Sequence, residues 1–378
     1  MEEKLIYLDN AATSFPKPEA VYRRVDEILR VVSGNPGRAS HRMAIEASRV
    51  IFKARETVSR VINLPDSGRL AFTKNATEAI NIALKGLVKP GDHVITTSFE
   101  HNSVVKTLAR LEKDGVSVTK VRPDAGGFVD PGEVGAAIRK QTRMVCISHA
   151  SNVYGTVQDV GAIGAECRSR GVIFMVDGAQ TVGALPVDVE AMGIDILAGT
   201  GHKALFGPQG TGFLYVAAGI EPAPLVDGGT GELDSELEMP ERLESGTMNT
   251  PGVGGLGAGA QFVLSEGVEK IRAHEVSLVS TILGGLEEIE GVSIIGTRDA
   301  SRRASLVAFN IEGLPPAEAG SRLDEEHSML LRCGAHCAPE AHREAGTHPD
   351  GAIRVSPGYF TTAAEIDEFL GAVRGLAR

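Results

Sequence analysis

The sequence predicts an α/β protein with a mostly parallel, mixed sheet of about seven strands, followed by a smaller α+β domain. Between about residues 68 and 217, short β-rich runs alternate with helical spacing, which is typical of a doubly wound sheet. After about residue 257 the pattern changes to long helical stretches with three strand-like runs. A chain of 378 residues is also long enough for about two domains.

Seven runs predict the strands of the large sheet, namely residues 70–72, 93–97, 116–121, 144–148, 172–176, 194–198 and 213–216. Residues 78–88 and 102–111 have helical spacing and are long enough to form crossover helices between parallel strands. The connection after Ala198 differs, because residues 199–211 are too rich in glycine for such a helix. We therefore expect the last strand to run antiparallel.

The second domain is predicted from its own strands, residues 292–295, 306–311 and 353–356. A helical pattern from Val263 to Leu283 and beyond predicts one long helix that joins the two domains. We expect a large domain over residues 16–257 and a small domain formed by residues 1–15 and 258–378. The active site is expected in the cleft between them.

Composition excludes several classes of protein. With 38 basic and 49 acidic residues the net charge is −11, so neither nucleic acid nor an anionic membrane is an expected partner. No apolar run reaches the ~18 residues of a membrane span. Four cysteines are too few for a disulfide scaffold in a chain of this length. No signal or transit peptide is readable at the start, so we expect a cytoplasmic protein.

Polar residues follow several predicted strands, where open α/β sheets bind their ligands. Residues 73–78 offer amides and a hydroxyl to a phosphate, although a simple helix cap explains them too. Asp177 follows an apolar strand and needs a cationic or N–H partner, with a helix N-cap as the alternative. Lys203, a candidate for an imine with a carbonyl cofactor, has a surface lysine as its alternative. Together with the ring of His101, these residues form the set that pyridoxal phosphate (PLP) needs.

Six segments together resemble the class V aminotransferases: residues 7–13 (YLDNAAT), 77–81 (TEAIN), 100–102 (EHN), 177–180 (DGAQ), 201–203 (GHK) and 246–250 (GTMNT). Within that family, residues 332–339 (RCGAHCAP) resemble the active-site loop of cysteine desulfurases of the SufS-like second group. The resemblance covers nearly the whole chain in order. It implies the PLP-dependent transferase fold type I, a homodimer with shared active sites, and desulfurization of L-cysteine.

The resemblance also implies cofactor contacts. Lys203 would hold PLP covalently and take the Cα proton, Asp177 would pair with the ring nitrogen, and His101 would stack on the ring. The other implied contacts are Ala76 through its backbone, Thr77, Thr200 and His202 at the phosphate, Asn152 and Gln180 at the phenolic oxygen and ring, and Thr247 at the phosphate of the neighbouring subunit.

On the substrate side, the resemblance implies that Arg354 and Arg332 bind the carboxylate of L-cysteine. Cys337 would be the nucleophile that receives the sulfur as a persulfide and leaves L-alanine. Arg332 and His336 would supply a positive field around its thiol. A sulfur-acceptor protein or thiol would then remove the sulfur.

Three alternatives stay open beside this interpretation. A selenocysteine lyase, or another class V PLP lyase or aminotransferase, would use the same scaffold with less need for Cys337. A zinc site is an alternative because the gaps between successive candidate ligands resemble zinc-ligand spacing, although we expect no metal; these ligands are Cys333, Cys337, His342 and His348. Residues 252–257 (GVGGLG) match a dinucleotide-binding pattern, but without a buried strand before them a small-residue packing face is favoured.

Overall fold

A computed structural model describes residues 5–37, 40–229 and 237–378. Its large sheet has seven strands in the order β2-β8-β7-β6-β5-β3-β4. β8 pairs antiparallel with β2 and β7, and the other pairs are parallel, so the predicted mixed sheet is confirmed. The strands are β2 (Leu70–Thr73), β3 (His93–Thr97), β4 (Ser117–Val121), β5 (Thr142–Ser148), β6 (Ile173–Asp177), β7 (Ile196–Thr200) and β8 (Gly212–Val216).

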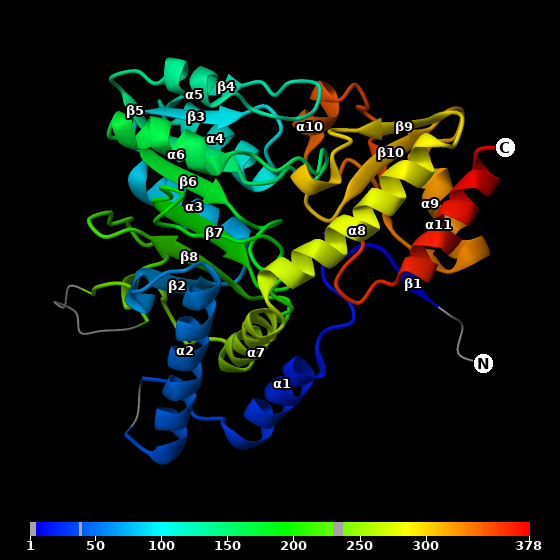
Figure 1. Cartoon of the computed structure of the whole chain (residues 1–378). Helices are drawn as coiled ribbons and strands as arrows, with labels where there is room; N and C mark the ends of the chain where they lie inside the picture. The colour runs from blue at the N-terminus through cyan, green and yellow to red at the C-terminus, as the bar shows by residue number, and fades with distance from the viewer. Residues whose placement is uncertain (1–4, 38–39, 230–236) are drawn as a thin grey trace.

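Successive residues of a strand point to opposite faces of the sheet. Apolar strand residues therefore lie on both faces, and helices cover each face. Val94 and Cys146 pack with helices α3 and α4 in one core. Ile95 and Ile147 pack in a second core that also takes residues of α2, α5, α6 and α7. The crossover helices are α3 (Ala76–Leu87), α4 (Asn102–Lys113), α5 (Pro131–Ala137) and α6 (Val160–Ser169). The expected doubly wound arrangement is therefore present (Figure 1).

The glycine pattern at residues 252–257 lies in helix α7 (Thr250–Glu266), which packs on α1 (Glu19–Val31) and α2 (Arg42–Val61). A Cβ atom on Gly254 would collide with Ile28 and Val50, and one on Gly257 would collide with Ala54. The glycines thus let three helices approach closely, which confirms the packing-face interpretation.

The second sheet has four strands in the order β12-β13-β10-β9, and all of its pairs are antiparallel. Its strands are β9 (Val292–Ile295), β10 (Val307–Ile311), β12 (Arg332–Gly334) and β13 (Ala352–Val355), with a parallel pair of β1 (Ile6–Tyr7) and β11 (Met329–Leu330) beside it. Helices α8 (Val268–Glu287), α9 (Pro316–His327), α10 (Pro339–Glu344) and α11 (Ala363–Leu376) complete this part, and short 3₁₀ turns lie at Ser67–Arg69, Glu241–Leu243 and Ala300–Arg302. The sequence missed β12 because Arg, Cys and Gly show no apolar alternation.

The single long helix expected from Val263 onward is wrong. Gly267 breaks it with φ 86°, and its N–H bonds to the carbonyl of Val263 at 2.9 Å, so α7 ends before α8 begins. Val263 belongs to the core of the large sheet, whereas α8 packs mostly in the core of the small one. The division into residues 16–257 against 1–15 and 258–378 stays a proposal, and residues 1–4 lie outside the described part of the chain. None of the described helices is long and apolar enough to cross a lipid bilayer.

Candidate active site

A cavity of about 220 Å³ lies at the carboxyl ends of the central strands, and residues of both sheets line it. The structure brings together there most of the residues expected from the sequence: Ala76, Thr77, His101, Asn152, Asp177, Gln180, Thr200, His202, Lys203, Arg332 and Arg354. Cys337 and Thr247 do not line it. The open sheet therefore places its polar strand ends around one space.

One end of the cavity has the features of an anion site. Asn75 caps α3 by accepting the N–H of Glu78 at 2.9 Å, so the simple cap expected as an alternative exists. The N-terminal turn of this helix still faces the cavity through Ala76 and Thr77. Thr200 Oγ1 and His202 Nδ1 are buried without a hydrogen-bond partner in the described chain. These orphaned polar atoms beside a helix N-terminus fit a phosphate group.

The middle of the cavity fits a flat, protonated ring. Asp177 ends β6, and one of its carboxylate oxygens accepts the N–H of Ala179 at 3.0 Å. Its other oxygen has no hydrogen-bond partner among the described residues. His101 accepts the N–H of Ser103 on Nδ1 at 3.1 Å, so its neutral ring carries the proton on Nε2. Burial lowers the pKa of His101 despite the nearby Asp177, and this favours the neutral ring.

Lys203 follows β7, and its side-chain amine makes no hydrogen bond or ion pair with any described residue. Burial, followed by repulsion from Arg354, lowers the pKa of its amine to about 8. At pH 7 roughly one amine in ten is then neutral, against fewer than one in a thousand for an ordinary lysine. The exposed-lysine alternative is therefore not realised, and Lys203 is a nucleophilic amine inside the cavity.

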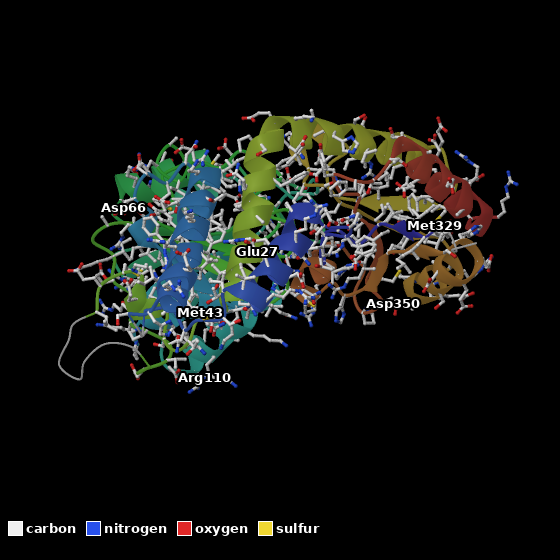
Figure 2. All side chains as sticks on the ribbon, turned by 90° about the horizontal axis from the view of Figure 1, so that it is seen from below. Glu27, Met43, Asp66, Arg110, Met329 and Asp350 are labelled. Carbon is white, nitrogen blue, oxygen red and sulfur yellow. The ribbon has the colours of Figure 1, made fainter. Side chains whose placement is uncertain are left out.

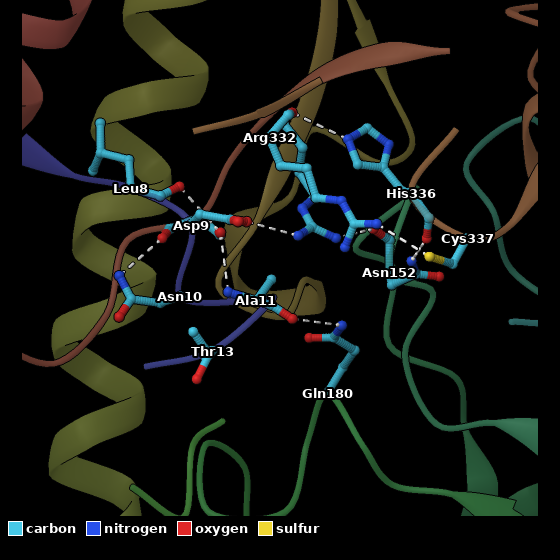
Figure 3. A network of polar contacts seen from close by, with 12 residues as sticks. Leu8, Asp9, Asn10, Ala11, Thr13, Asn152, Gln180, Arg332, His336 and Cys337 are labelled. Atoms are coloured by element: carbon cyan, nitrogen blue, oxygen red, sulfur yellow. Dashed lines mark hydrogen bonds and ion pairs between the residues drawn. The ribbon is translucent and has the colours of Figure 1, made fainter. Parts of the chain in front are cut away.

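Arg354, on β13, is fully buried and fixed from two sides by Asp9 and Asn152, which are labelled in Figure 3. Its Nη2 forms an ion pair with Asp9 Oδ1 at 2.9 Å, and its Nη1 donates to the carbonyl of Asn152 at 3.2 Å. Its buried Nε has no partner among the described residues. No role for Asp9 follows from the sequence alone, although it lies in the segment YLDNAAT that carried the resemblance. A long-range ion pair has no signal in local sequence.

The Cys337 loop, residues 332–339, lies at the edge of the cavity. Arg332 and Asn152, which both line the cavity, form hydrogen bonds with residues of this loop. Arg332 Nη2 donates to Cys337 Sγ at 3.1 Å. Asn152 donates its side-chain amide to the carbonyl of His336 at 2.6 Å, and Asn102 donates its backbone N–H to the carbonyl of Cys337 at 2.9 Å. The loop is thus attached to the large sheet while its thiol stays exposed.

The expected positive field from His336 is wrong. Its ring is buried, and this burial lowers its pKa to about 3, so it is neutral near pH 7. Among the residues that the structure describes, Arg332 is the one that brings a positive charge into contact with the Cys337 sulfur. A buried histidine of this kind cannot be told from an exposed one in a polar stretch of sequence.

The zinc alternative is not supported by the geometry. Cys333 lies opposite Ile353 in the β12–β13 pair and packs against the core of the small sheet, away from the exposed Cys337. Burial raises the pKa of Cys333 to about 11. Within the described ranges, no three His, Cys, Asp or Glu side chains are placed to hold a metal ion.

Two expected cofactor contacts lie differently from the others. Gln180 lines the cavity and donates its side-chain amide to the carbonyl of Ala11 at 3.2 Å, so it also attaches the N-terminal segment. Thr247 is exposed, next to a second cavity of about 800 Å³ that Gly246 and Met248 line with residues of α2. It is therefore out of contact with the cavity of its own chain.

Glu100 is a further residue that the sequence analysis left without a role. Its carboxylate is fully buried and accepts hydrogen bonds from Ser148 Oγ at 2.6 Å, from Ser148 N at 3.1 Å and from Thr97 Oγ1 at 2.5 Å. Burial, with a smaller contribution from Asp177, raises the pKa of Glu100 to about 7. It precedes His101, bonds to Ser148 in the cavity wall, and joins the ends of β3 and β5.

Comparison with known proteins identifies the family of the chain. The profile of the aminotransferase class-V family matches residues 6–369. A probable cysteine desulfurase of Methanothermobacter thermautotrophicus is 37% identical over 371 residues, which cover 96% of this chain and 92% of that protein. The cysteine desulfurase IscS of Vibrio cholerae is 34% identical over 98% of this chain and 92% of its own length.

Solved structures show the same fold. The apo structure of the cysteine desulfurase from Thermococcus onnurineus NA1 has a TM-score of 0.93 and 34% identity, covering 99% of this chain and 94% of that chain. The Escherichia coli cysteine desulfurase CsdA has a TM-score of 0.87 and 29% identity, covering 97% and 93% of the two chains. The chain therefore belongs to the class V aminotransferases, a family of PLP-dependent enzymes of fold type I, and within that family to the cysteine desulfurases.

Proposed function

We propose that this protein converts L-cysteine to L-alanine with PLP and transfers the sulfur to Cys337 as a persulfide. One observation carries the proposal: Arg332 holds the exposed thiol of Cys337 at the edge of the cavity that contains Lys203 and Asp177. Transaminases and racemases have no need of a thiol held in this position. The names of the relatives support the same activity.

The residues of the cavity divide the work of binding PLP and moving protons. When bound, PLP supplies an electron sink that weakens the bonds at Cα and Cβ of an amino acid. Thr200, His202 and the start of α3 would hold the phosphate, and His101 would pack against the ring. Asp177 would keep a proton on the ring nitrogen through its free carboxylate oxygen. Lys203 would hold the cofactor covalently, and its Nζ would accept the Cα proton.

Cys337 performs the sulfur transfer. Its sulfur attacks the sulfur of L-cysteine, so that an S–S bond forms while the C–S bond breaks. The electron pair of the C–S bond stays with the carbon, which then takes up a proton. In sum, the Cys337 thiol and L-cysteine give the Cys337 persulfide and L-alanine, and no outside oxidant is consumed. Arg332 stabilises the attacking thiolate by a charge-assisted hydrogen bond.

The activity is tested by incubating the PLP-loaded protein with L-cysteine and a reductant, and by measuring sulfide and alanine together. Equal amounts of both products are expected over many turnovers. Parallel reactions with L-selenocysteine measure the competing lyase activity. Pyruvate, or alanine without sulfide, would contradict the proposal.

Arg354 is expected to determine the affinity for the substrate. Replacing it by lysine removes the flat guanidinium, and we expect KM for L-cysteine to rise about 10- to 100-fold because a charge-assisted contact to the carboxylate is lost. Steady-state kinetics measure this effect, and a thermal melt verifies that the variant is folded. The exchange of Arg322 for lysine on the surface of α9 is the matched control. An unchanged KM would show that Arg354 does not bind the carboxylate.

We also propose a homodimer in which Thr247 reaches the phosphate site of the other subunit. Apolar side chains are exposed on the surfaces of α1 and α2, the face seen from below in Figure 2, where Glu27 and Met43 are labelled. Leu29 and Phe52 are 59% and 58% exposed there, and Phe52 also lines the second cavity beside Thr247. A second copy of the chain covers such a surface well.

For the homodimer, replacing Phe52 by aspartate is expected to shift the protein from dimer to monomer, because a charge would be buried in the contact. Analytical ultracentrifugation measures the change, and PLP occupancy is expected to fall with it. Leu5, 48% exposed beside β1, provides the control Leu5→Asp, which should remain dimeric. A monomeric wild-type protein with full PLP occupancy would refute the shared site.

The proposed chemistry also favours particular surroundings. All four cysteines are free, and the reaction requires Cys337 to be reduced at the start of each cycle, which the cytoplasm provides. We therefore propose a cytoplasmic enzyme whose persulfide is removed by a thiol or a sulfur-acceptor protein that reaches the exposed loop.

A further inference from the structure

Two buried histidines form a chain of hydrogen bonds beneath the Cys337 loop. His336 Nε2 lies 3.1 Å from the carbonyl oxygen of Arg332, and its Nδ1 lies 3.1 Å from His342 Nε2. His342 Nδ1 lies 2.7 Å from Thr347 Oγ1. Both residues are buried, since His336 is 2% and His342 is 0% exposed. The proposed chemistry makes no use of His342 or Thr347.

The carbonyl oxygen of Arg332 determines which atom donates and which accepts in each of these hydrogen bonds. A carbonyl oxygen only accepts, so His336 must carry its proton on Nε2 and accept on Nδ1. His342 must then donate from Nε2 and accept on Nδ1, and the hydroxyl of Thr347 must donate to it. Burial lowers the pKa of His336 to about 3 and that of His342 to about 4, in agreement with two neutral rings.

The chain of hydrogen bonds ends at Arg332, the residue that contacts the sulfur of Cys337. Arg332 accepts from His336 through its carbonyl and donates to Cys337 through its guanidinium (Figure 3). His336 and Cys337 both have left-handed backbones, with φ 49° and 58°. Such a conformation is unfavourable for a residue with a side chain and persists only where surrounding contacts hold it.

We propose that His342 and Thr347 are positioning residues, which hold Cys337 against Arg332 by fixing the ring of His336. The inference rests on the proposed function in that it assigns them to the sulfur-transfer step. His342, on α10, donates a hydrogen bond to Nδ1 of His336, and Thr347 sets the tautomer of His342 that allows this. The fixed ring of His336 then holds Arg332 through its carbonyl and Cys337 as the next residue of the chain. If His342 only filled space in the core, a side chain of similar shape could replace it. The positioning role instead requires a hydrogen-bond donor at the position of His342 Nε2.

The test measures how fast iodoacetamide alkylates Cys337 in the PLP-loaded enzyme without substrate, with Cys337→Ala as the blank. In His342→Leu the buried Nδ1 of His336 loses its donor, and we expect alkylation at pH 7.5 to slow roughly tenfold as the Arg332 contact is lost. The rate constant kcat for alanine formation should fall by a similar factor. KM for L-cysteine and the absorbance of the bound cofactor near ~420 nm should not change.

Conservative replacements separate the hydrogen bond from packing. Glutamine places an N–H close to the position of His342 Nε2, so His342→Gln is expected to restore the alkylation rate to within about threefold of wild type. Thr347→Val should slow alkylation, and Thr347→Ser should restore it. His348→Leu is the matched control. His348 is exposed and follows Thr347 in the chain, so Cys337 of this variant should be alkylated at the wild-type rate.

Two results would overturn the assignment. One is wild-type alkylation and kcat in His342→Leu or Thr347→Val. The other is an equal loss in His342→Gln and His342→Leu, which would mean that only the shape of the side chain matters. Alkylation needs no turnover, so its outcome is independent of the proposed function, which fails instead if Cys337→Ala still releases sulfide.

Discussion

Cys337→Ala is expected to reduce sulfide release from L-cysteine by about three orders of magnitude or more, because the acceptor of the sulfur is removed. The variant should still bind PLP and show the spectrum of the wild-type enzyme, since Cys337 does not line the cavity. Sulfide and alanine assays together with an absorbance spectrum measure both effects. Rapid mixing with L-cysteine should still change that spectrum, because the substrate can enter.

The matched control for this loss is Cys333→Ala. Cys333 is four residues away in sequence but packs against the core of the small sheet, so its loss should cost stability without preventing sulfur transfer. Mass spectrometry of the wild-type enzyme after turnover should find one additional sulfur atom on Cys337. Unchanged sulfide release in Cys337→Ala would reject a desulfurase that works through this thiol and would favour a lyase.

Lys203→Ala is expected to abolish covalent attachment of PLP and turnover together, because no other described lysine lines the cavity. In the wild-type apoprotein, the rate of covalent attachment should rise with pH. The neutral amine is the reacting form, so with a pKa of about 8 the rate increases nearly tenfold from pH 6 to pH 7 and levels off above pH 9. Stopped-flow absorbance during mixing with PLP measures this profile.

Lys85→Ala provides the control for Lys203, because Lys85 is exposed on α3 and should leave both spectrum and rate unchanged. A rate that continues to rise steeply up to pH 10 would indicate an ordinary lysine and would contradict the buried amine. Covalent attachment in Lys203→Ala would show that another residue holds the cofactor.

Sequence patterns predicted the large sheet well because most of its strands are buried on both faces. Residues such as those of β5 and β6 form continuous apolar runs with polar residues at their ends, and this pattern is local. Open α/β sheets bind ligands at the carboxyl ends of their strands, and this rule located Asp177 and Lys203. Their roles were inferred first from the chemistry of the two side chains and then from the resemblance to a family, and they are still predictions.

The features that the sequence did not reveal depend on distant contacts or on single residues. Asp9 and Arg354 are 345 positions apart, so no periodicity connects them. The break at Gly267 needs a positive φ that a helical pattern with one glycine does not reveal. The neutral state of His336 follows from burial in three dimensions, and β12 is too short to show alternation.

The long-range Asp9–Arg354 ion pair also has a consequence for biosynthesis. Asn10 donates its side-chain amide to the carbonyl of Ser356, so the first strand segment needs residues near the end of the chain as partners. On the ribosome, the part of the cavity formed by residues around 76 and 200–203 emerges well before the part formed by Arg332 and Arg354. A nascent chain therefore cannot complete this cavity until nearly all of it has been translated.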